Sequence, residues 1–226
     1  EALNPEIYNK WLEATGLKIY EGFGQTETTL CIGTIYPWSE PNPGAIGFPV
    51  PGYDVHILGE DGESCPRGAT GEICIRVLSQ ARKTCGLLDT YNFSEEDTKK
   101  ALHDGFYHTG DTAYRDEKGT FCYVGRNDDV IKSSGYRIGP FEIESVMLEH
   151  PAVKEVAVTG VPDPIRGFAV KATVVLSDKY FPSEELTKEL QKYVKDNTAP
   201  YKYPRVVVFK DELPKTISGK IQRNKL

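Results

Sequence analysis

The sequence predicts a fold with α/β and α+β parts, because its pattern changes twice along the chain. Residues 1–36 combine an amphipathic helix with an apolar strand that ends in a glycine turn, as in α/β sheets. Residues 37–126 hold short strands between proline and glycine turns, which indicates a β-rich subdomain. Residues 127–226 alternate between helix and strand patterns, which is typical of a small α+β domain.

The first elements can be placed from local signals. In "NPEIYNKWLEATG", Asn4 is an N-cap candidate, Pro5 suits the first helical turn and Gly16 suits the C-terminal end. The segment "LKIYEGFG" predicts a buried strand that runs into a glycine turn, where ligands of open α/β sheets bind. Ser94 is expected to cap a surface helix within "FSEEDTKKALHDG".

Composition excludes several classes of protein. The chain has 226 residues, 39% of them hydrophobic, and a net charge of −6, which argues against nucleic acid as its main partner. Its five cysteines are odd in number and never spaced as CxxC, so neither a disulfide framework nor a zinc knuckle is indicated, and we expect a reducing compartment. No apolar run reaches the roughly 18 residues of a membrane span. Because the first residue is Glu1 rather than Met, we expect the natural start to lie upstream.

The segment "EGFGQTET" is the first candidate for a phosphate site. Gly22 and Gly24 would let backbone N–H groups approach an anion closely. Thr26 could donate to a phosphate oxygen, and Glu27 could hold a Mg²⁺ ion that bridges phosphates. A polar turn that only closes a strand is an equally open interpretation.

Three later segments carry further candidates. In "GFYHTGD", Asp111 is predicted to end a strand, where a carboxylate can accept both ribose hydroxyls; the four scattered histidines, His108 included, give no metal-binding spacing. Arg126 opens "GRNDDVIKSSGYRIGP", whose sharp glycine turn indicates a site rather than a solvated charge run. The tail "PKTISGKIQRNKL" presents Lys220 after a Ser-Gly pair, with a solvated basic end as the alternative.

Taken together and in this order, "EGFGQTET", "YHTGD", "GRNDDVIKSSGYRIGPFEIE" and "PKTISGK" resemble the later signature motifs of the acyl-adenylate-forming superfamily. Within it, "GQTET", "PNPGAIGFPVPGYDVHILGEDG" and "PKTISGKIQR" look most like the medium-chain acyl-CoA synthetases, a mitochondrial matrix group. The resemblance implies that a carboxylate and ATP give acyl-AMP and pyrophosphate, and that coenzyme A then takes the acyl group. ATP, Mg²⁺ and coenzyme A are the implied cofactors.

The resemblance also implies roles for residues. ATP would be held by Glu21, Gly22, Phe23, Gly24, Gln25, Thr26, Asp111, Arg126 and Lys220. Lys220 and Thr26 would be catalytic, Thr26 and Arg137 would lie near the substrate, Glu27 would hold Mg²⁺, and Asp128 would be the hinge of the small domain. Coenzyme A would contact Ser134, Gly135, Tyr136, Arg166, Lys195, Tyr203, Pro204 and Arg205.

The family's Ser/Thr/Gly-rich phosphate loop and most of its acyl-pocket domain have no counterpart here. Residues 1–36 would therefore be the tail of the large AMP-binding domain, residues 37–126 its β-rich subdomain and residues 127–226 the small C-terminal domain. The missing N-terminal half would be the chain's partner. Two alternatives stay open: another adenylating enzyme, amino-acid-activating or luciferase-like, and a module that binds a nucleotide or coenzyme A without catalysis. Acyl chain length and oligomeric state are not encoded in these motifs.

Overall fold

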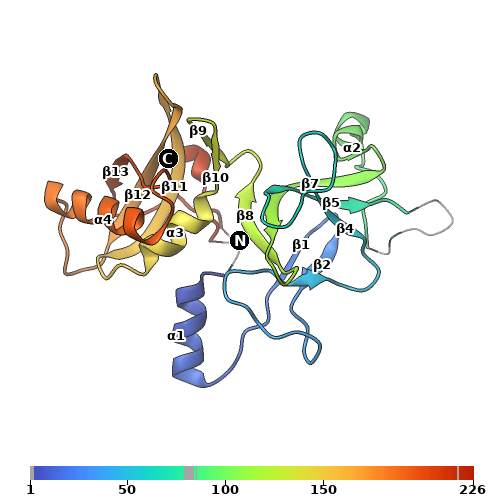
Figure 1. The fold of residues 1–226 in the computed structure, drawn as a ribbon, viewed down its shortest axis with the longest axis horizontal. Coiled ribbons are helices and arrows are strands. Elements are labelled where there is room, and N and C mark those ends of the chain that lie inside the picture. The colour runs from blue at the N-terminus through green and yellow to red at the C-terminus, as the bar shows by residue number, and fades with distance from the viewer. Residues whose placement is uncertain (1–2, 79–83, 85, 218) are drawn as a thin grey trace. The chain divides into compact units, whose positions relative to one another are not determined.

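The computed structural model describes residues 3–78, 84, 86–217 and 219–226. By its internal contacts the chain divides into two compact units, one that ends at Asn127 and one that spans Asp128–Leu226. Figure 1 shows their elements along the chain. No helix in the described ranges is both long and apolar enough to cross a membrane.

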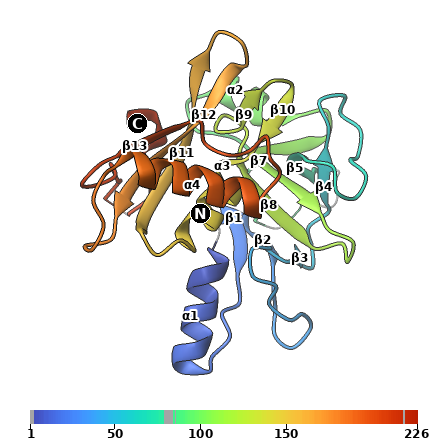
Figure 2. The ribbon, with the colours of Figure 1, turned by 60° about the vertical axis from the view of Figure 1, so that its left-hand side comes forward.

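The first unit begins with helix α1, Pro5–Thr15, whose ends follow the sequence prediction. The side chain of Asn4 accepts a hydrogen bond from the N–H of Glu6, and Gly16 closes the helix in a left-handed conformation. Figures 1 and 2 show α1 standing apart from the strands of its unit. The apolar face is consequently open, since the side chains of Ile7 and Trp11 are 55% and 45% exposed.

The buried strand predicted over "LKIYEGFG" is wrong for its first five residues. Residues 17–21 form no strand, and Leu17 is 62% exposed. The strand β1, Gly22–Gln25, lies later and pairs antiparallel with β2, Thr29–Gly33, which pairs in turn with β3, Phe48–Pro49. A strand needs neighbouring strands for its backbone groups, and in the part of the chain that the structure describes no strand pairs with residues 17–21, although Glu21 hydrogen-bonds to Thr34. In the described structure the glycine segment is therefore one strand of the β1–β2 hairpin.

A five-stranded antiparallel sheet forms the centre of the first unit. It consists of β4 (Val55–Leu58), β5 (Gly71–Arg76), β7 (Phe106–Arg115) and β6 (Leu102–His103) in that order, with β8 (Phe121–Arg126) paired to β7. Helix α2, Glu95–Ala101, is capped by Ser94 as predicted. The strand expected to end at Asp111 continues to Arg115, because residues 111–115 pair with β8. Asp111 consequently lies inside a strand.

The second unit, Asp128–Leu226, combines a sheet with two α-helices. Its sheet has the order β10 (Tyr136–Ile138), β9 (Ile131–Ser133), β12 (Gly167–Leu176) and β11 (Val153–Asp163), and β13 (Val206–Phe209) joins β12 in parallel. Helices α3 (Pro140–Leu148) and α4 (Glu184–Asn197) pack on one face of the β11–β12 hairpin (Figure 2). Leu213, Ile221 and Leu226 pack against Ala157 and Val175 on the other face.

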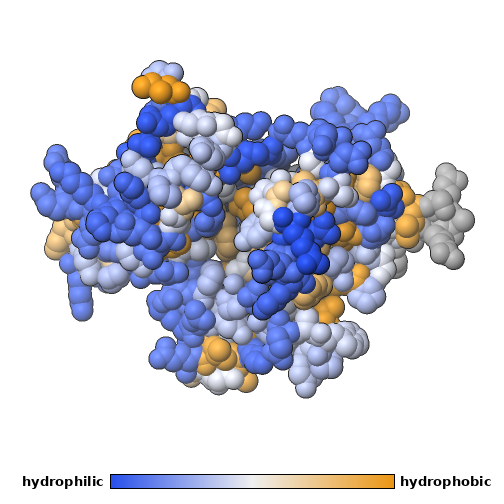
Figure 3. Space-filling model, in the orientation of Figure 1, coloured by the Kyte–Doolittle hydropathy of each residue, from blue (hydrophilic) through white to orange (hydrophobic). Residues whose placement is uncertain are grey.

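Alternation along β11 and β12 explains these two layers. Val156 and Val158 point to the helices, whereas Ala157 between them points to the C-terminal segment. The sheet therefore holds the tail that carries Lys220 on the face opposite the helices. Figure 3 shows a mainly hydrophilic surface with separate hydrophobic spots, one of them at the tip of the β11–β12 hairpin, where Ile165 is 85% exposed.

Candidate nucleotide and coenzyme A sites

A polar network in the first unit joins three of the predicted ATP-binding residues. The Nε2 atom of Gln25 donates to Oδ2 of Asp111 at 2.6 Å, and Nη1 of Arg126 donates to the same oxygen at 3.2 Å. Both donors also reach the carbonyl oxygen of Thr109, at 2.8 and 3.0 Å. The hydroxyl of Tyr123 donates to Oδ1 of Asp111 at 2.9 Å. Residues far apart in the sequence thus meet around one carboxylate.

The Asp111 carboxylate is buried, with only 5% of the residue exposed. Burial raises its pKa above the usual range, and Arg126, Tyr123 and Gln25 oppose that rise by stabilising the charged form. Oδ2 accepts two hydrogen bonds and Oδ1 accepts one, so Oδ1 retains capacity for a further donor. A ribose hydroxyl is a donor of that kind. A second hydroxyl would have to displace one of the present partners.

Two tyrosines that the sequence motifs did not single out extend this network. The hydroxyl of Tyr107 donates to Oε1 of Gln25 at 2.8 Å, which fixes the amide so that Nε2 faces Asp111. The hydroxyl of Tyr91 donates to Oε1 of Glu27 at 3.0 Å. The pKa values of both tyrosines are raised, chiefly by burial, so both hydroxyls remain donors at neutral pH.

Thr26 and Glu27 occupy the two central positions of the β1–β2 turn. The turn is closed by hydrogen bonds between Gln25 and Thr28, from backbone N–H to carbonyl at 3.1 Å and from backbone N–H to hydroxyl at 2.8 Å. Thr26 is exposed and Glu27 is half-buried beside Tyr91. A single accessible carboxylate suits Mg²⁺, which commonly takes one or two carboxylates together with substrate phosphates. Glu27 therefore fits the role of a magnesium ligand.

Other residues of "EGFGQTET" have evident structural tasks. A Cβ atom on Gly24 would lie 1.7 Å from the carbonyl oxygen of Thr29, so close pairing of β1 with β2 requires glycine there. At Gly22 such an atom would meet only the end of the Leu30 side chain, at 2.4 Å. Oε1 of Glu21 accepts from the backbone N–H of Leu3 at 2.7 Å, and burial raises the pKa of Glu21.

The side chain of Phe23 packs against the hydrophobic core. Its ring is partly buried against the core of the first unit, 6.2 Å from the ring of Tyr123. Tyr123 in turn donates to Asp111, so Phe23 contacts a side chain of the carboxylate network. Phe23 therefore packs next to the candidate site through Tyr123.

In the second unit the predicted coenzyme A residues form two groups, and the first surrounds a tight hairpin. Ser134 and Gly135 connect β9 to β10, and both have positive φ angles, of 50° and 83°. Two such residues define a type I′ turn, which the right-handed twist of paired strands favours. The N–H of Ser134 donates to the carbonyl oxygen of Arg166 at 3.0 Å, which brings Arg166 to the turn. Tyr136 follows and is 49% exposed.

The second group is basic and aromatic. The guanidinium of Arg205 lies 4.7 Å from the centre of the Tyr203 ring, and Nη1 of Arg205 donates to the Tyr203 hydroxyl at 2.7 Å. Nζ of Lys195 lies 5.9 Å from the same ring centre, while Pro204 is buried between its exposed or half-buried neighbours. Tyr201, absent from the sequence prediction, stacks on Tyr136 at 4.0 Å and links the two groups.

Lys220 lies in a turn that its own backbone closes. The carbonyl of Thr216 accepts from the N–H of Gly219 at 2.9 Å, and its hydroxyl accepts from the N–H of Lys220 at 3.0 Å. Lys215 and Ile221 form an isolated antiparallel β-bridge. Lys220 is exposed. A partly buried ion pair anchors the tail three residues later, because Nη2 of Arg223 donates to both oxygens of Glu144, at 2.9 and 2.8 Å.

Asp128 and Arg137 complete the predicted set. Asp128 is exposed in a turn, and the division between the two units falls directly before it. Arg137 is exposed on β10, opposite Lys132 of β9. These positions agree with a hinge and with a surface near a ligand, and both roles stay predictions.

The comparisons with known proteins place the chain in a family. Residues 1–82 match the model of the AMP-binding enzymes, and residues 142–220 match that of the AMP-binding enzyme C-terminal domain. The anthranilate CoA ligase AuaEII, in complex with anthranoyl-AMP, has 34% identity and a TM-score of 0.89 over 100% of this chain and 42% of its own. A benzoate CoA ligase from Burkholderia xenovorans LB400 has 36% identity and a TM-score of 0.87 over 100% and 43%. These likenesses confirm the mixed α/β fold.

The chain therefore belongs to the AMP-binding enzymes. It is similar along its whole length to acyl-coenzyme A synthetases named as mitochondrial: it is 50% identical to ACSM3 of Mus musculus and 52% identical to ACSM5 of Rattus norvegicus. Each match covers 100% of this chain and 39% of the relative's sequence. The chain thus spans about two fifths of the length of these relatives.

Proposed function

We propose that this chain is part of an acyl-coenzyme A synthetase and carries its ribose-binding carboxylate, its adenylating lysine and its coenzyme A surface. The reaction has two steps: a carboxylate and ATP give acyl-AMP and pyrophosphate, and the thiol of coenzyme A then takes the acyl group and releases AMP. The similarity to acyl-coenzyme A synthetases along the whole chain supports the reaction class. The observation that carries the nucleotide part is the network around Asp111.

In this proposal Asp111 accepts a ribose hydroxyl at Oδ1, while Gln25 and Arg126 keep the carboxylate oriented. A carboxylate already fixed by three donors loses little freedom when the nucleotide binds, so its hydrogen bond contributes to affinity. Arg126 is 45% exposed at its side chain and can itself turn toward the nucleotide. Thr26 meets the phosphates and the substrate carboxylate, and Glu27 holds the magnesium ion that accompanies ATP.

Lys220 acts in the first step. Its exposed ammonium sits on a short closed turn, so the small unit can present it to the α-phosphate and the substrate carboxylate. A positive charge aimed at the negative charge that develops in the transition state accelerates adenylation. The second step needs the thiol in the same place, so the small unit swings about Asp128 between the steps.

Coenzyme A would lie along the second unit. Arg166, Lys195 and Arg205 supply positive charge for its phosphates, and the Tyr136–Tyr201 stack and Tyr203 supply flat surfaces for its adenine. The backbone of the type I′ turn at Ser134 and Gly135 lies beside Arg166. In this proposal Arg137, exposed on the neighbouring strand β10, would lie near the acyl or phosphate end.

The rest of the enzyme supplies the acyl pocket, so a complete synthetase with this sequence is the right test object. Because the relatives are named as mitochondrial, we propose the mitochondrion as its location. The resemblance of the sequence motifs to medium-chain acyl-CoA synthetases leads us to propose medium-chain carboxylates as its substrates. Pyrophosphate release and acyl-coenzyme A formation should both depend on a medium-chain acid. Transfer of the acyl group to an amine with no coenzyme A requirement would contradict the proposal and favour another adenylating class.

A further inference from the structure

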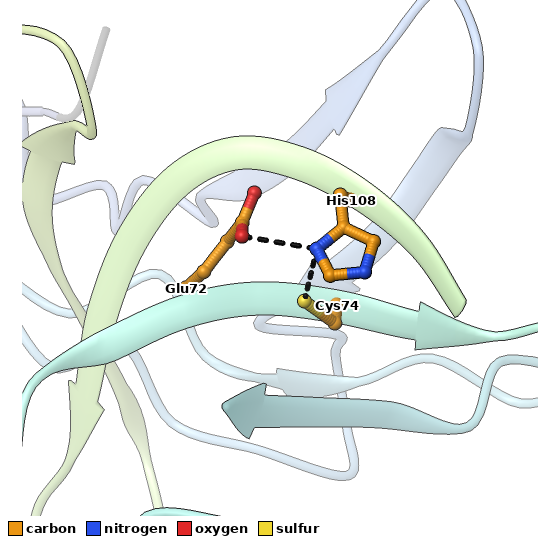
Figure 4. A group of neighbouring side chains, drawn as sticks. All are labelled: Glu72, Cys74 and His108. Atoms are coloured by element: carbon orange, nitrogen blue, oxygen red, sulfur yellow. Dashed lines mark hydrogen bonds and ion pairs between the residues drawn. The ribbon is translucent and has the colours of Figure 1, made fainter. Parts of the chain in front are cut away.

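Three side chains of different chemistry converge outside the nucleotide network. Glu72 and Cys74 belong to β5 and His108 belongs to β7. Nδ1 of His108 lies 3.0 Å from Oε2 of Glu72 and 3.5 Å from Sγ of Cys74 (Figure 4). Within the part of the chain that the structure describes, this is the one group of three metal-ligating side chains whose ligand atoms all lie within 4.8 Å of one another.

Strand geometry explains the convergence. Glu72 and Cys74 are two residues apart on β5, and alternate residues of a strand face the same side. Cys74 is the direct cross-strand partner of His108 on β7, so their side chains leave the sheet together. The histidine spacing along the sequence conceals this arrangement, because the site combines one i, i+2 pair with a residue of a neighbouring strand.

The two distances from His108 are close to those between ligands of one metal ion. Zinc lies about 2.3 Å from a cysteine sulfur and about 2.0–2.1 Å from a histidine nitrogen or carboxylate oxygen. In a tetrahedral site these lengths separate nitrogen from sulfur by roughly 3.6 Å and nitrogen from oxygen by roughly 3.3 Å. The observed separations of 3.5 and 3.0 Å therefore need adjustments of only a few tenths of an ångström.

The surroundings hold these side chains in place yet leave access. Oε1 of Glu72 accepts from the backbone N–H of Gly110 at 2.9 Å, which directs Oε2 toward His108. The ring of His103 stacks on that of His108 at 3.8 Å and restricts its rotation. Cys74 is fully buried, while the side chains of Glu72 and His108 are 23% and 17% exposed. An ion and a water ligand can reach the group from the exposed side.

We propose that Glu72, Cys74 and His108 form a binding site for a divalent transition-metal ion, zinc by chemical preference, with water as the fourth ligand. Thiolate and imidazole ligands select zinc and similar ions, whereas magnesium prefers oxygen alone. This site is distinct from the magnesium assigned to Glu27. Since Gly110 precedes Asp111, an ion here would tie β5 to the strand that presents the ribose carboxylate.

Calorimetric titration with Zn²⁺, and optical titration with Co²⁺ as its spectroscopic substitute, would test the site in the purified protein. We expect one ion per chain and a thiolate-to-cobalt charge-transfer band in the near ultraviolet. Cys74→Ser should abolish that band and weaken Zn²⁺ binding at least tenfold, and His108→Gln should weaken binding similarly. The matched controls Cys122→Ser, another buried thiol, and His56→Gln, the cross-strand neighbour of Cys74, should retain both signals.

Thermal melting provides a second readout, which can be measured on the unaltered protein. Zn²⁺ should raise the Tm of the unaltered protein, because a ligand that binds only the folded state stabilises it. The shift should vanish in Glu72→Gln and should not occur with Mg²⁺ at the same concentration. Stoichiometric Zn²⁺ binding that survives Cys74→Ser, or a cobalt complex without the thiolate band, would overturn the assignment, as would the absence of binding.

Discussion

Gln25 and Asp111, 86 residues apart in the sequence, are joined by a hydrogen bond of 2.6 Å. The contact connects the β1–β2 hairpin to the centre of β7, so the glycine-rich motif and the acidic motif belong to one site. Tyr107 holds the Gln25 amide and Tyr123 holds the other Asp111 oxygen, at 2.8 and 2.9 Å. Gln25, Tyr107 and Tyr123 thus hold the Asp111 carboxylate in a fixed orientation.

Asp111→Asn should impair ATP binding more than folding. The amide keeps the shape but loses the charged acceptor, and a hydrogen bond to a charged group contributes about 1.5–3 kcal/mol. We expect the KM for ATP in the complete enzyme to rise roughly 10- to 100-fold. Asp178→Asn, an exposed site far along the sequence, is the control and should leave KM unchanged. An unaltered KM in Asp111→Asn would remove this carboxylate from the nucleotide site.

The raised pKa of Asp111 also predicts how the same variant changes stability with pH. The folded protein binds the Asp111 proton more tightly than the unfolded chain, so this group favours folding below the ordinary aspartate pKa of 3.8. That contribution disappears as pH rises through the folded-state pKa. At neutral pH the Tm of Asp111→Asn should therefore be no lower than that of the unaltered protein. Any increase in Tm caused by the substitution should become smaller as the pH is lowered. The quantity to compare is the Tm of Asp111→Asn minus the Tm of the unaltered protein. A smaller value of this difference at pH 7 than at acidic pH would contradict the predicted direction.

Gly24→Ala tests whether the glycine-rich motif is fixed by its own hairpin. The new Cβ would meet the Thr29 backbone, which cannot retreat without separating β1 from β2. We expect a loss of about 1–3 kcal/mol in unfolding free energy, measured by denaturant titration. Gly22→Ala is the matched control, because it meets only the mobile end of Leu30 and should cost less. Equal effects at both positions would show that the hairpin does not set the requirement.

Asp128→Pro tests the hinge. Proline fixes φ and removes the backbone N–H, so rotation about this residue should be restricted. One half-reaction should then fall much more than the other, while Asp128→Ala should affect both only slightly. Each half-reaction is measured separately in the complete enzyme, with a melting curve for each variant. Uniform loss together with a lowered Tm would indicate misfolding and would leave the hinge role unsupported.

Local signals predicted the elements that depend on few residues. The caps at Asn4, Ser94 and Gly16 lie where the sequence places them, because each involves hydrogen bonds within one turn. The strand expected over residues 17–21 failed, because a strand requires neighbours that are distant in sequence. The end expected at Asp111 was wrong for a related reason, since pairing with β8 extends β7 to Arg115.

The candidate site shows the same division. Motif resemblance supplied Gln25, Asp111 and Arg126, and the structure brings these three together. It gave no role to Tyr107, which opens the "YHTGD" motif, and it did not include Tyr91. The partners of these tyrosines lie 82 and 64 residues away and are fixed only by tertiary packing. The Glu72–Cys74–His108 group escaped for the same reason, because it depends on strand register rather than on sequence spacing.

The most direct test of the proposed function compares the two half-reactions in Lys220→Ala, made in a complete synthetase that carries this sequence. Lys220 is exposed and its turn is closed by backbone groups, so the variant should fold and melt normally. Loss of one transition-state contact of this kind costs on the order of 3–4 kcal/mol, roughly 10²- to 10³-fold in rate. Lys225→Ala, a neighbouring exposed lysine, is the control. We predict that Lys220→Ala loses acyl-adenylate formation to this extent yet retains thioester formation from supplied acyl-AMP; equal loss in both half-reactions, or none, would contradict the account.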